Sequence, residues 1–238
     1  MGTIADRIKN DIRFQEAFNS CMNCGMCTGV CPAAEFYHYD PRNICNIVQR
    51  GDEAELEKLL RSDTIWYCGQ CMSCKTRCPR CNAPGAVITI LRTISQEMGF
   101  FTDSEKGRQQ YAIEQIIGNN ILNRGYCVHP ETVDPDLHPE QGPVWAWFVK
   151  NMDAVCEKLG ANLNQDGAGA LRKIRQENLD EMRRIFDVTG GTDLRARIER
   201  CSEQKAEELN LSTSPGENQR YSDYLMNAMT WNNNQHCK

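Results

Sequence analysis

The stretch CMNCGMCTGVCP spans Cys21 to Pro32, and CGQCMSCKTRCP repeats its pattern from Cys68 to Pro79. We call these stretches the first run and the second run. Each holds four cysteines and a proline in the order C-x-x-C-x-x-C-x-x-x-C-P, within a chain of 238 residues that has 14 cysteines. Secreted disulfide frameworks are typical of smaller chains that are poor in helix, so metal ligation in a reducing compartment fits this pattern better.

The cysteine spacing is that of bacterial ferredoxins with two iron-sulfur clusters. Three thiolates at three-residue spacing let a tight loop surround one four-iron, four-sulfur cube. The fourth cysteine, expected at the start of a helix, turns away from that cube, and in two-cluster proteins it binds the other cluster. The expected ligands of two [4Fe-4S] clusters are Cys21, Cys24, Cys27 and Cys78 for the first, and Cys68, Cys71, Cys74 and Cys31 for the second.

Residues beside the expected ligands agree with this interpretation. Gly25 and Gly69 follow cysteines, where a small residue lets backbone amides approach sulfur closely. Pro32 and Pro79 suit the first turn of a helix, which needs no backbone donor. Zinc is the alternative metal, but zinc sites usually join two C-x-x-C pairs that lie a dozen or more residues apart. A zinc-binding scaffold is therefore kept as the alternative function from a different functional class.

Six cysteines lie outside the expected ligand set: Cys45, Cys81, Cys127, Cys156, Cys201 and Cys237. Cys45, Cys156 and Cys201 fall on helical patterns and are interpreted as buried, inert thiols. Cys81 follows Cys78 by three residues, so a substitute ligand and a redox-active thiol are both open for it, although a structural role is favoured.

Composition and the absence of certain motifs argue against several other classes of function. A formal net charge of -5 argues against nucleic-acid binding, which needs a concentrated basic face. The apolar runs are shorter than the roughly 20 residues that cross a bilayer, and the N-terminus lacks an apolar signal core, so we expect a cytoplasmic protein without a transmembrane segment. Because no dinucleotide fingerprint or catalytic triad is indicated, the chain is expected to conduct electrons and to carry no substrate chemistry of its own.

Helical periodicity predicts an all-α fold. An amphipathic helix is expected over 3–20, with a capping box from Thr3 to Asp6. Two short helices separated by Gly51 are expected between the runs, where small bacterial ferredoxins have β-structure. A further helix is expected after Pro84, with a strand as the alternative. These elements define a cluster-binding domain at 1–101.

A helical extension is expected at 102–210, with an irregular Pro-rich loop at 126–143. A capping box from Thr102 to Glu105 is expected to begin a helix. Its predicted apolar face consists of Ile113, Ile116, Ile117 and Ile121. Three more helical patterns follow: VWAWFVKNMDAVCEKL, ALRKIRQENLDEMRRIF and LRARIERCSEQKAEEL. The polar tail at 211–238 holds aromatic residues and methionines, so it should either dock on another protein of a complex or pack on its own domain.

Two such runs joined by a helical linker resemble the α-helical ferredoxin domain of iron-sulfur subunits in succinate, glycolate and glycerol-3-phosphate dehydrogenases. The stretches at 21–52 and 64–80 look most like the C-type subunit of heterodisulfide reductase, through features such as DPR at 40–42 and WYCGQC at 66–71. The resemblance covers about residues 1–100. It implies an α-helical ferredoxin domain with two four-iron clusters, followed by the helical C-terminal extension.

The resemblance also implies a function and partners. In that family, the C-type subunit passes electrons from a flavin-containing A-type subunit to the B-type subunit, a CCG-domain protein whose unusual clusters cleave disulfides. This chain has no adjacent cysteine pair, so disulfide cleavage on it is not expected. The alternative within the same class is the iron-sulfur subunit of a flavin-dependent dehydrogenase of the glycolate or glycerol-3-phosphate type.

Two features depart from the compact members of that family. The second run continues as CPRC to Cys81, where the family usually has CPRG. The chain also continues from about residue 100 to residue 238. This extension resembles that of longer C-type proteins from sulfur-oxidising bacteria, whose complexes process sulfane sulfur with lipoate-binding partner proteins.

Overall fold

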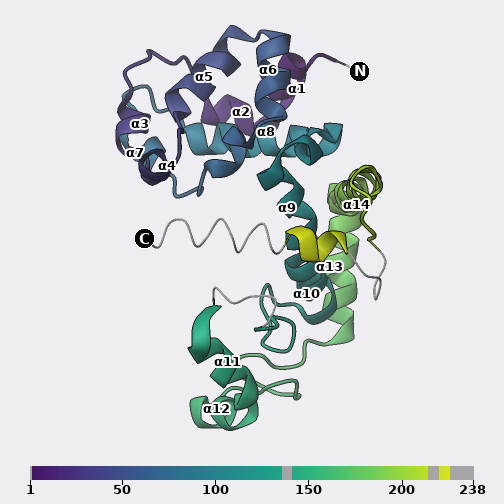
Figure 1. Ribbon diagram of the computed structural model, residues 1–238. Helices are drawn as coiled ribbons and strands as arrows, with labels where there is room; N and C mark the ends of the chain where they lie inside the picture. Colours follow the sequence, from purple (N-terminus) through teal and green to yellow (C-terminus); the bar gives the residue numbers. More distant parts are fainter. Residues whose placement is uncertain (1, 136–140, 214–219, 226–238) are drawn as a thin grey trace. The chain divides into compact units, whose positions relative to one another are not determined.

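The computed structural model describes residues 2–135, 141–213 and 220–225 (Figure 1). Secondary structure in these ranges is helical apart from one isolated β-bridge between Ser212 and Arg220. The all-α prediction is therefore confirmed. Contacts within the chain divide it into two units, Met1–Arg108 and Gln109–Lys238, and each is described by itself. In the described part of the chain, no helix has the length and apolar character needed to cross a bilayer.

The N-terminal unit contains both cysteine runs and a continuous hydrophobic core. Its elements are α1 (Ile4–Asn10), α2 (Ile12–Ala17), α3 (Met26–Gly29), α4 (Pro32–Phe36), α5 (Pro41–Arg50), α6 (Glu53–Leu60), the 3₁₀ helix η1 (Asp63–Tyr67), α7 (Ser73–Arg77), α8 (Pro84–Met98), the 3₁₀ helix η2 (Phe100–Asp103) and the first part of α9 (Glu105–Ile113).

Helix α8 is the central element of this unit, and α1, α2, α5, α6 and α7 all contact it (Figure 1). Its buried side includes Val87, Ile88, Ile90, Leu91 and Ile94. The predicted helix after Pro84 is confirmed, and the strand alternative is wrong. The predicted pair of linker helices is also confirmed as α5 and α6. Gly51 ends α5 at φ +68°, a left-handed conformation that glycine adopts without steric cost.

The predicted helix over 3–20 is two helices, because Asp11 interrupts it. Asp11 ends α1 in an extended conformation and caps α2 by accepting a hydrogen bond from the Arg13 amide. The predicted capping box between Thr3 and Asp6 is confirmed at the start of α1. The break has a consequence for packing, since Ile12 is 85% exposed although it continues the spacing of the buried isoleucines of α1.

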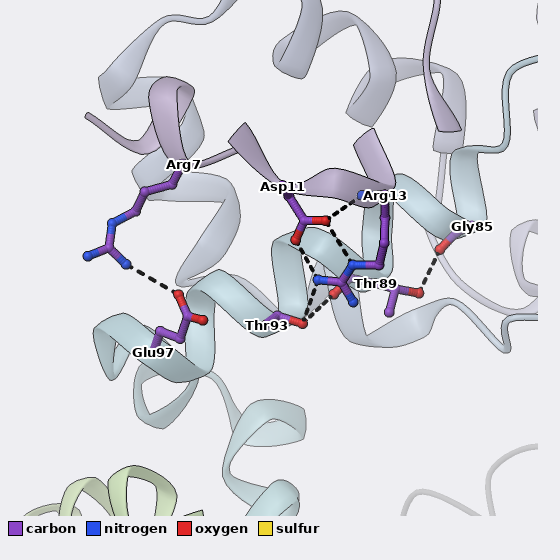
Figure 2. A network of polar contacts seen from close by, with 7 residues as sticks. All are labelled: Arg7, Asp11, Arg13, Gly85, Thr89, Thr93 and Glu97. Atoms are coloured by element: carbon purple, nitrogen blue, oxygen red, sulfur yellow. Dashed lines mark hydrogen bonds and ion pairs between the residues drawn. The ribbon is translucent and has the colours of Figure 1, made fainter. Parts of the chain in front are cut away.

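Polar contacts join α1 and α2 to the surface of α8 (Figure 2). The Arg7 guanidinium lies 3.3 Å from Glu97. Arg13 donates hydrogen bonds to both carboxylate oxygens of Asp11 and a longer one, of 3.5 Å, to the Thr93 hydroxyl. Because exposed ion pairs contribute at most about 1 kcal/mol each, the attachment of these helices depends mainly on their buried apolar side chains.

The start of α9 differs from the prediction. Thr102 lies in η2 and its hydroxyl donates to the Gly99 carbonyl, so it does not cap α9. Ser104 takes this role, because its hydroxyl accepts a hydrogen bond of 2.8 Å from the Gly107 amide. The predicted capping box between Thr102 and Glu105 is therefore wrong.

The C-terminal unit comprises the rest of α9, the π-helical segment η3 (Glu114–Gly118), α10 (Asn119–Arg124), α11 (Gly142–Lys150), α12 (Met152–Leu159), α13 (Gln176–Thr189) and α14 (Gly191–Glu208). Residues 221–225 are also helical. The predicted irregular loop at 126–143 contains no helix over 126–135, but Gly142 and Pro143, which the prediction includes in it, already belong to α11.

Three predictions for this unit need correction. The pattern VWAWFVKNMDAVCEKL forms α11 and α12, separated at Asn151. Leu171 and Ile174 precede α13 and belong to no helix. The predicted isoleucine face of α9 is also wrong, because Ile113 is exposed. The buried residues of this stretch are Tyr111, Ala112, Glu114 and Asn120.

The described part of the tail packs within its own unit. Tyr221 and Leu225 are fully buried, and the Tyr221 ring lies 5.6 Å from that of Tyr111. This arrangement matches one of the two expectations for the tail. The predicted docking role of Met226, Met229 and Trp231 lies outside the described residues.

Candidate functional site

The eight cysteines of the two runs surround two cavities in the N-terminal unit. The first cavity is lined by Cys21, Cys24, Cys27 and Cys78. The second cavity is lined by Cys31, Cys68, Cys71 and Cys74. Each cavity thus combines three cysteines of one run with the last cysteine of the other. Helices α3 and α7, which carry parts of the two runs, contact each other and bring the runs together.

The same backbone conformation occurs in both runs. Asn23 and Gln70 have φ values of +60° and +53°, which are uncommon for residues other than glycine. In this conformation, the amide of each residue donates a hydrogen bond of 3.4 Å to the sulfur of the cysteine two positions before it, Cys21 or Cys68. Such bonds orient the sulfur and stabilise its negative charge.

The prolines that end the two runs have different roles. Pro32 begins α4 and Cys31 is its N-cap residue, as predicted. Pro79 does not begin a helix. It lies in a turn closed by a 3.1 Å hydrogen bond from the Cys81 amide to the Cys78 carbonyl. Pro84 begins the next helix, because the five residues after Cys78 are needed for this turn and the loop that follows.

The first cavity is bordered by a buried thiol. Cys45, on α5, lines this cavity and is buried, as predicted. Burial raises the pKa of the Cys45 thiol, and the charges of Cys27 and Cys21 raise it further, so this sulfur stays protonated at neutral pH. Arg42 and Arg80 supply positive charge at the same cavity.

The second cavity is bordered by a buried phenol. Tyr39 lines it and is 4% exposed. Its hydroxyl has no hydrogen-bond partner among the described residues. Burial raises the pKa of this hydroxyl, and the neighbouring Cys68 raises it further. The hydroxyl is therefore a protonated donor beside a cysteine sulfur.

A cation supports the loop that leads into the second cavity. The guanidinium of Arg92, on α8, donates hydrogen bonds of 2.8 Å to the Ile65 carbonyl and 2.7 Å to the Cys68 carbonyl. Sequence reasoning missed both Tyr39 and Arg92. The one signal for Arg92 was a charged residue within the apolar stretch AVITILRTI of a buried helix.

The remaining described cysteines line neither of the two cavities. Cys81 is exposed, has φ +56° and lines neither cavity. Cys156 is buried, as predicted, whereas Cys201 is half-buried and Cys127 is exposed. Cys237 lies outside the described residues. All described cysteines are free of disulfide bonds.

The donor sets fit [4Fe-4S] clusters, each of which needs four thiolates. Four thiols stand around each cavity and all are free. In the described ranges, no three His, Cys, Asp or Glu side chains gather as ligands of a single metal ion. The sulfurs instead surround a hollow, which suits a group larger than one ion. Ligation by these eight cysteines stays a prediction.

Comparison with known proteins identifies the family. Residues 10–82 match the 4Fe-4S dicluster domain family. The C-type subunit of a ferredoxin:CoB-CoM heterodisulfide reductase from Methanosarcina acetivorans is 31% identical, across 79% of this chain and 69% of the relative. A C2 iron-sulfur subunit of CoB-CoM heterodisulfide reductase from Methanocaldococcus jannaschii is 33% identical, across 59% and 71%. The C2 subunit of an H2/formate:CoB-CoM heterodisulfide, ferredoxin reductase from Methanococcus maripaludis is 27% identical, across 63% and 77%.

The predicted resemblance is therefore confirmed over a longer part of the chain than the cysteine runs alone. The matched domain begins at the last residue of α1 and ends two residues before α8, so it contains the eight cysteines of the two runs. The chain belongs to the family of heterodisulfide reductase C-type subunits and is an iron-sulfur electron-transfer protein with a 4Fe-4S dicluster domain.

Proposed function

We propose that the chain binds two [4Fe-4S] clusters crosswise and passes electrons between a flavin-containing A-type subunit and a CCG-domain B-type subunit of a heterodisulfide-reductase-like complex. One observation carries the proposal: each cavity is lined by three cysteines of one run and one of the other. When bound, each cluster accepts and releases one electron at a potential set by its surroundings.

The side chains of the chain hold the clusters and limit their exposure. Four thiolates bind each cluster, and the amides of Asn23 and Gln70 direct positive charge at sulfur. Ile88 of α8 lines the second cavity on its buried side and excludes water there. One cysteine of each cavity, Cys24 or Cys71, is exposed. We propose these two edges as the places where electrons enter and leave.

Crosswise ligation is tested by finding which cysteine variants lose the same cluster signal. Electron paramagnetic resonance of anaerobically reduced protein should show the signals of two clusters in the unchanged chain. Cys31→Ala should abolish the same signal as Cys71→Ala, and Cys78→Ala the same signal as Cys24→Ala. Cys127→Ala is the matched control, because Cys127 is exposed and lies outside both runs. If Cys31→Ala instead abolished the signal that Cys24→Ala abolishes, ligation would be local to each run.

The cluster content and the partners are tested separately. An anaerobic preparation should contain about eight irons and eight sulfides per chain; a colourless zinc protein would contradict the proposal and support the scaffold alternative. Affinity purification from the native cell should recover a CCG-domain protein and a flavoprotein. Recovery of a lone flavin-dependent oxidase would support the glycolate dehydrogenase type instead.

We propose further that the cluster-binding domain is 1–101, that 102–210 is the extension and that 211–238 is the tail. The complex is proposed to be cytoplasmic and to serve sulfur metabolism, as in the long C-type proteins. Fractionation of the native cell, followed by immunodetection of the chain, tests the location.

A further inference from the structure

The C-terminal unit contains a cavity that has no part in cluster binding. Its volume is about 510 Å³, within the range of small-molecule sites. The loop after α10, Asn164 and the segment that leads into α13 form its walls. None of its lining residues is acidic, although the chain as a whole carries a formal charge of -5. Glu131 pairs with Arg124 and accepts a hydrogen bond from Asn164, two of the lining residues, so the positive charge of the cavity comes from Arg172 and Lys173.

Two exposed cations line this cavity, Arg172 and Lys173. Among the described residues, neither forms an ion pair with a carboxylate; Arg172 donates to the Gly169 carbonyl at 3.4 Å. The Tyr126 hydroxyl donates a 2.9 Å hydrogen bond to the Arg172 carbonyl and so holds this segment against the loop after α10. The backbone that carries both cations is thus held in place, and no carboxylate of the described residues neutralises their charge.

The N-terminus of α13 offers backbone amides beside the cavity, although Glu177 also places a carboxylate in this first turn. This helix has 14 residues, and no side chain caps its first turn at Arg175. Gln176 and Leu179, both in that turn, line the cavity. The first amides of a helix have no acceptor within the helix, and the helix dipole makes this end attractive for anions.

A buried histidine supplies an independent observation. His129 lines the cavity and is 1% exposed. Its Nδ1 accepts a hydrogen bond of 3.3 Å from the Glu131 amide and lies 3.3 Å from a guanidinium nitrogen of Arg124. With donors on Nδ1, the neutral ring carries its proton on Nε2. Nε2 forms no hydrogen bond of normal length and angle among the described residues, although the ring interacts with the Asn164 side chain, which lines the same cavity; this buried N–H group therefore has no well-formed acceptor.

The state of His129 follows from its neighbours. Burial, and then the charge of Arg124, lower the pKa of His129, so the ring is neutral at pH 7. Arg124 itself pairs with Glu131 at 2.7 Å, which leaves Arg172 and Lys173 as the cations of the cavity without an ion pair among the described residues. A neutral N–H donor, two cations and an uncapped helix end all favour an acceptor with several negative oxygens.

We propose that this cavity binds the phosphate group of a small organic molecule. A phosphate offers three terminal oxygens and close to two charges, which match the several separate donors better than a singly charged carboxylate does. Tyr126, Ile174 and Leu179 also line the cavity and supply apolar surface for the rest of the molecule. The proposal does not depend on the clusters.

Isothermal titration calorimetry of the full-length, cluster-containing protein tests it. Inorganic phosphate and glycerol phosphate should give saturable binding, whereas chloride and acetate at equal ionic strength should not. Arg172→Ala and Lys173→Ala should each weaken phosphate binding about tenfold, because each removes one charge-assisted contact. Arg184→Ala is the matched control, since Arg184 is an exposed cation of α13 that does not line the cavity.

The outcomes separate the proposal from its alternatives. Acetate binding as tight as phosphate binding would overturn the assignment to phosphate. Equal losses in Arg184→Ala would show attraction by net charge alone and would also overturn it. Unchanged iron content and circular dichroism in all three variants ensure that any loss of binding reflects the cavity. The absence of saturable heat with both phosphate compounds in the unchanged chain would end the proposal.

Discussion

The hydroxyl of Tyr39 lies beside the proposed second cluster, and its role can be measured directly. It is buried, has no hydrogen-bond partner among the described residues, and lies next to Cys68 at the second cavity, where we expect it to donate to the Cys68 sulfur once the cluster is bound. Replacing Tyr39 by phenylalanine removes this donor and keeps the ring. We expect the second cluster to assemble normally in Tyr39→Phe and to become harder to reduce.

The expected size of the shift follows from the hydrogen bond. Donation to a charged acceptor contributes about 1.5–3 kcal/mol. Because reduction places more negative charge on sulfur, the reduced state should receive the larger share, with a difference of about 1 kcal/mol. For a one-electron couple, 59 mV corresponds to about 1.4 kcal/mol, so the potential of the second cluster should fall by about 40 mV. The potential of the first cluster should not change.

The assay is an anaerobic redox titration followed by electron paramagnetic resonance. Tyr37→Phe is the matched control, because its ring stacks on Tyr67 at 4.3 Å and the residue lines neither cavity. Pulsed measurements in heavy water should also show one exchangeable proton coupling that Tyr39→Phe loses. An unchanged or higher potential in Tyr39→Phe, or an equal shift in Tyr37→Phe, would refute the reasoning.

Further predictions concern stability. Leu56→Ala should lower the free energy of unfolding by about 2–5 kcal/mol in guanidinium titrations, because Leu56 is fully buried, whereas Ile12→Ala at an exposed site should change it by less than about 0.5 kcal/mol. Gly107→Ala should lower the melting temperature by more than about 4 °C, since its methyl group would lie 2.2 Å from the Phe101 carbonyl oxygen; an unchanged melting temperature would contradict this geometry. Thermal stability should also fall from pH 7 to pH 5, because unfolded His129 takes up a proton below its ordinary pKa of about 6.5 while the folded ring, whose pKa is lowered, resists it. His129→Gln should reduce that fall, and an equal fall in this variant would show that other groups cause it.

The two-run organisation could be predicted from the sequence, because the information lies in local spacing. Cysteines at three-residue intervals need a tight loop, and Gly51 followed by Asp52 marks the end of one helix and the cap of the next. The linker helices, α8 and the family resemblance could all be predicted from such local patterns.

Other features depend on local side-chain hydrogen bonds and on tertiary contacts, which the periodicity of apolar residues does not reveal. Asp11 is compatible with a helix interior, yet its carboxylate bonds the Arg13 amide and begins a new helix, which leaves Ile12 exposed. Pro79 has the sequence context of a helix start, but the loop must first bring Cys78 to the first cavity. The roles of Tyr39 and Arg92 could not be predicted from the sequence, because they come from contacts with residues far away in the chain.

The sharing of cysteines between the two cavities has a consequence for biosynthesis. The first cavity lacks a thiol until the ribosome has synthesised Cys78, and the second lacks one until Cys74 has been synthesised, although Cys21 is made long before either. On the proposed ligation, cluster loading is thereby postponed until the second run has been made and the contact between α3 and α7 has joined the two runs. A nascent chain halted between the runs would display only part of each binding site, and the cell's assembly machinery would meet both unfinished sites at the same moment.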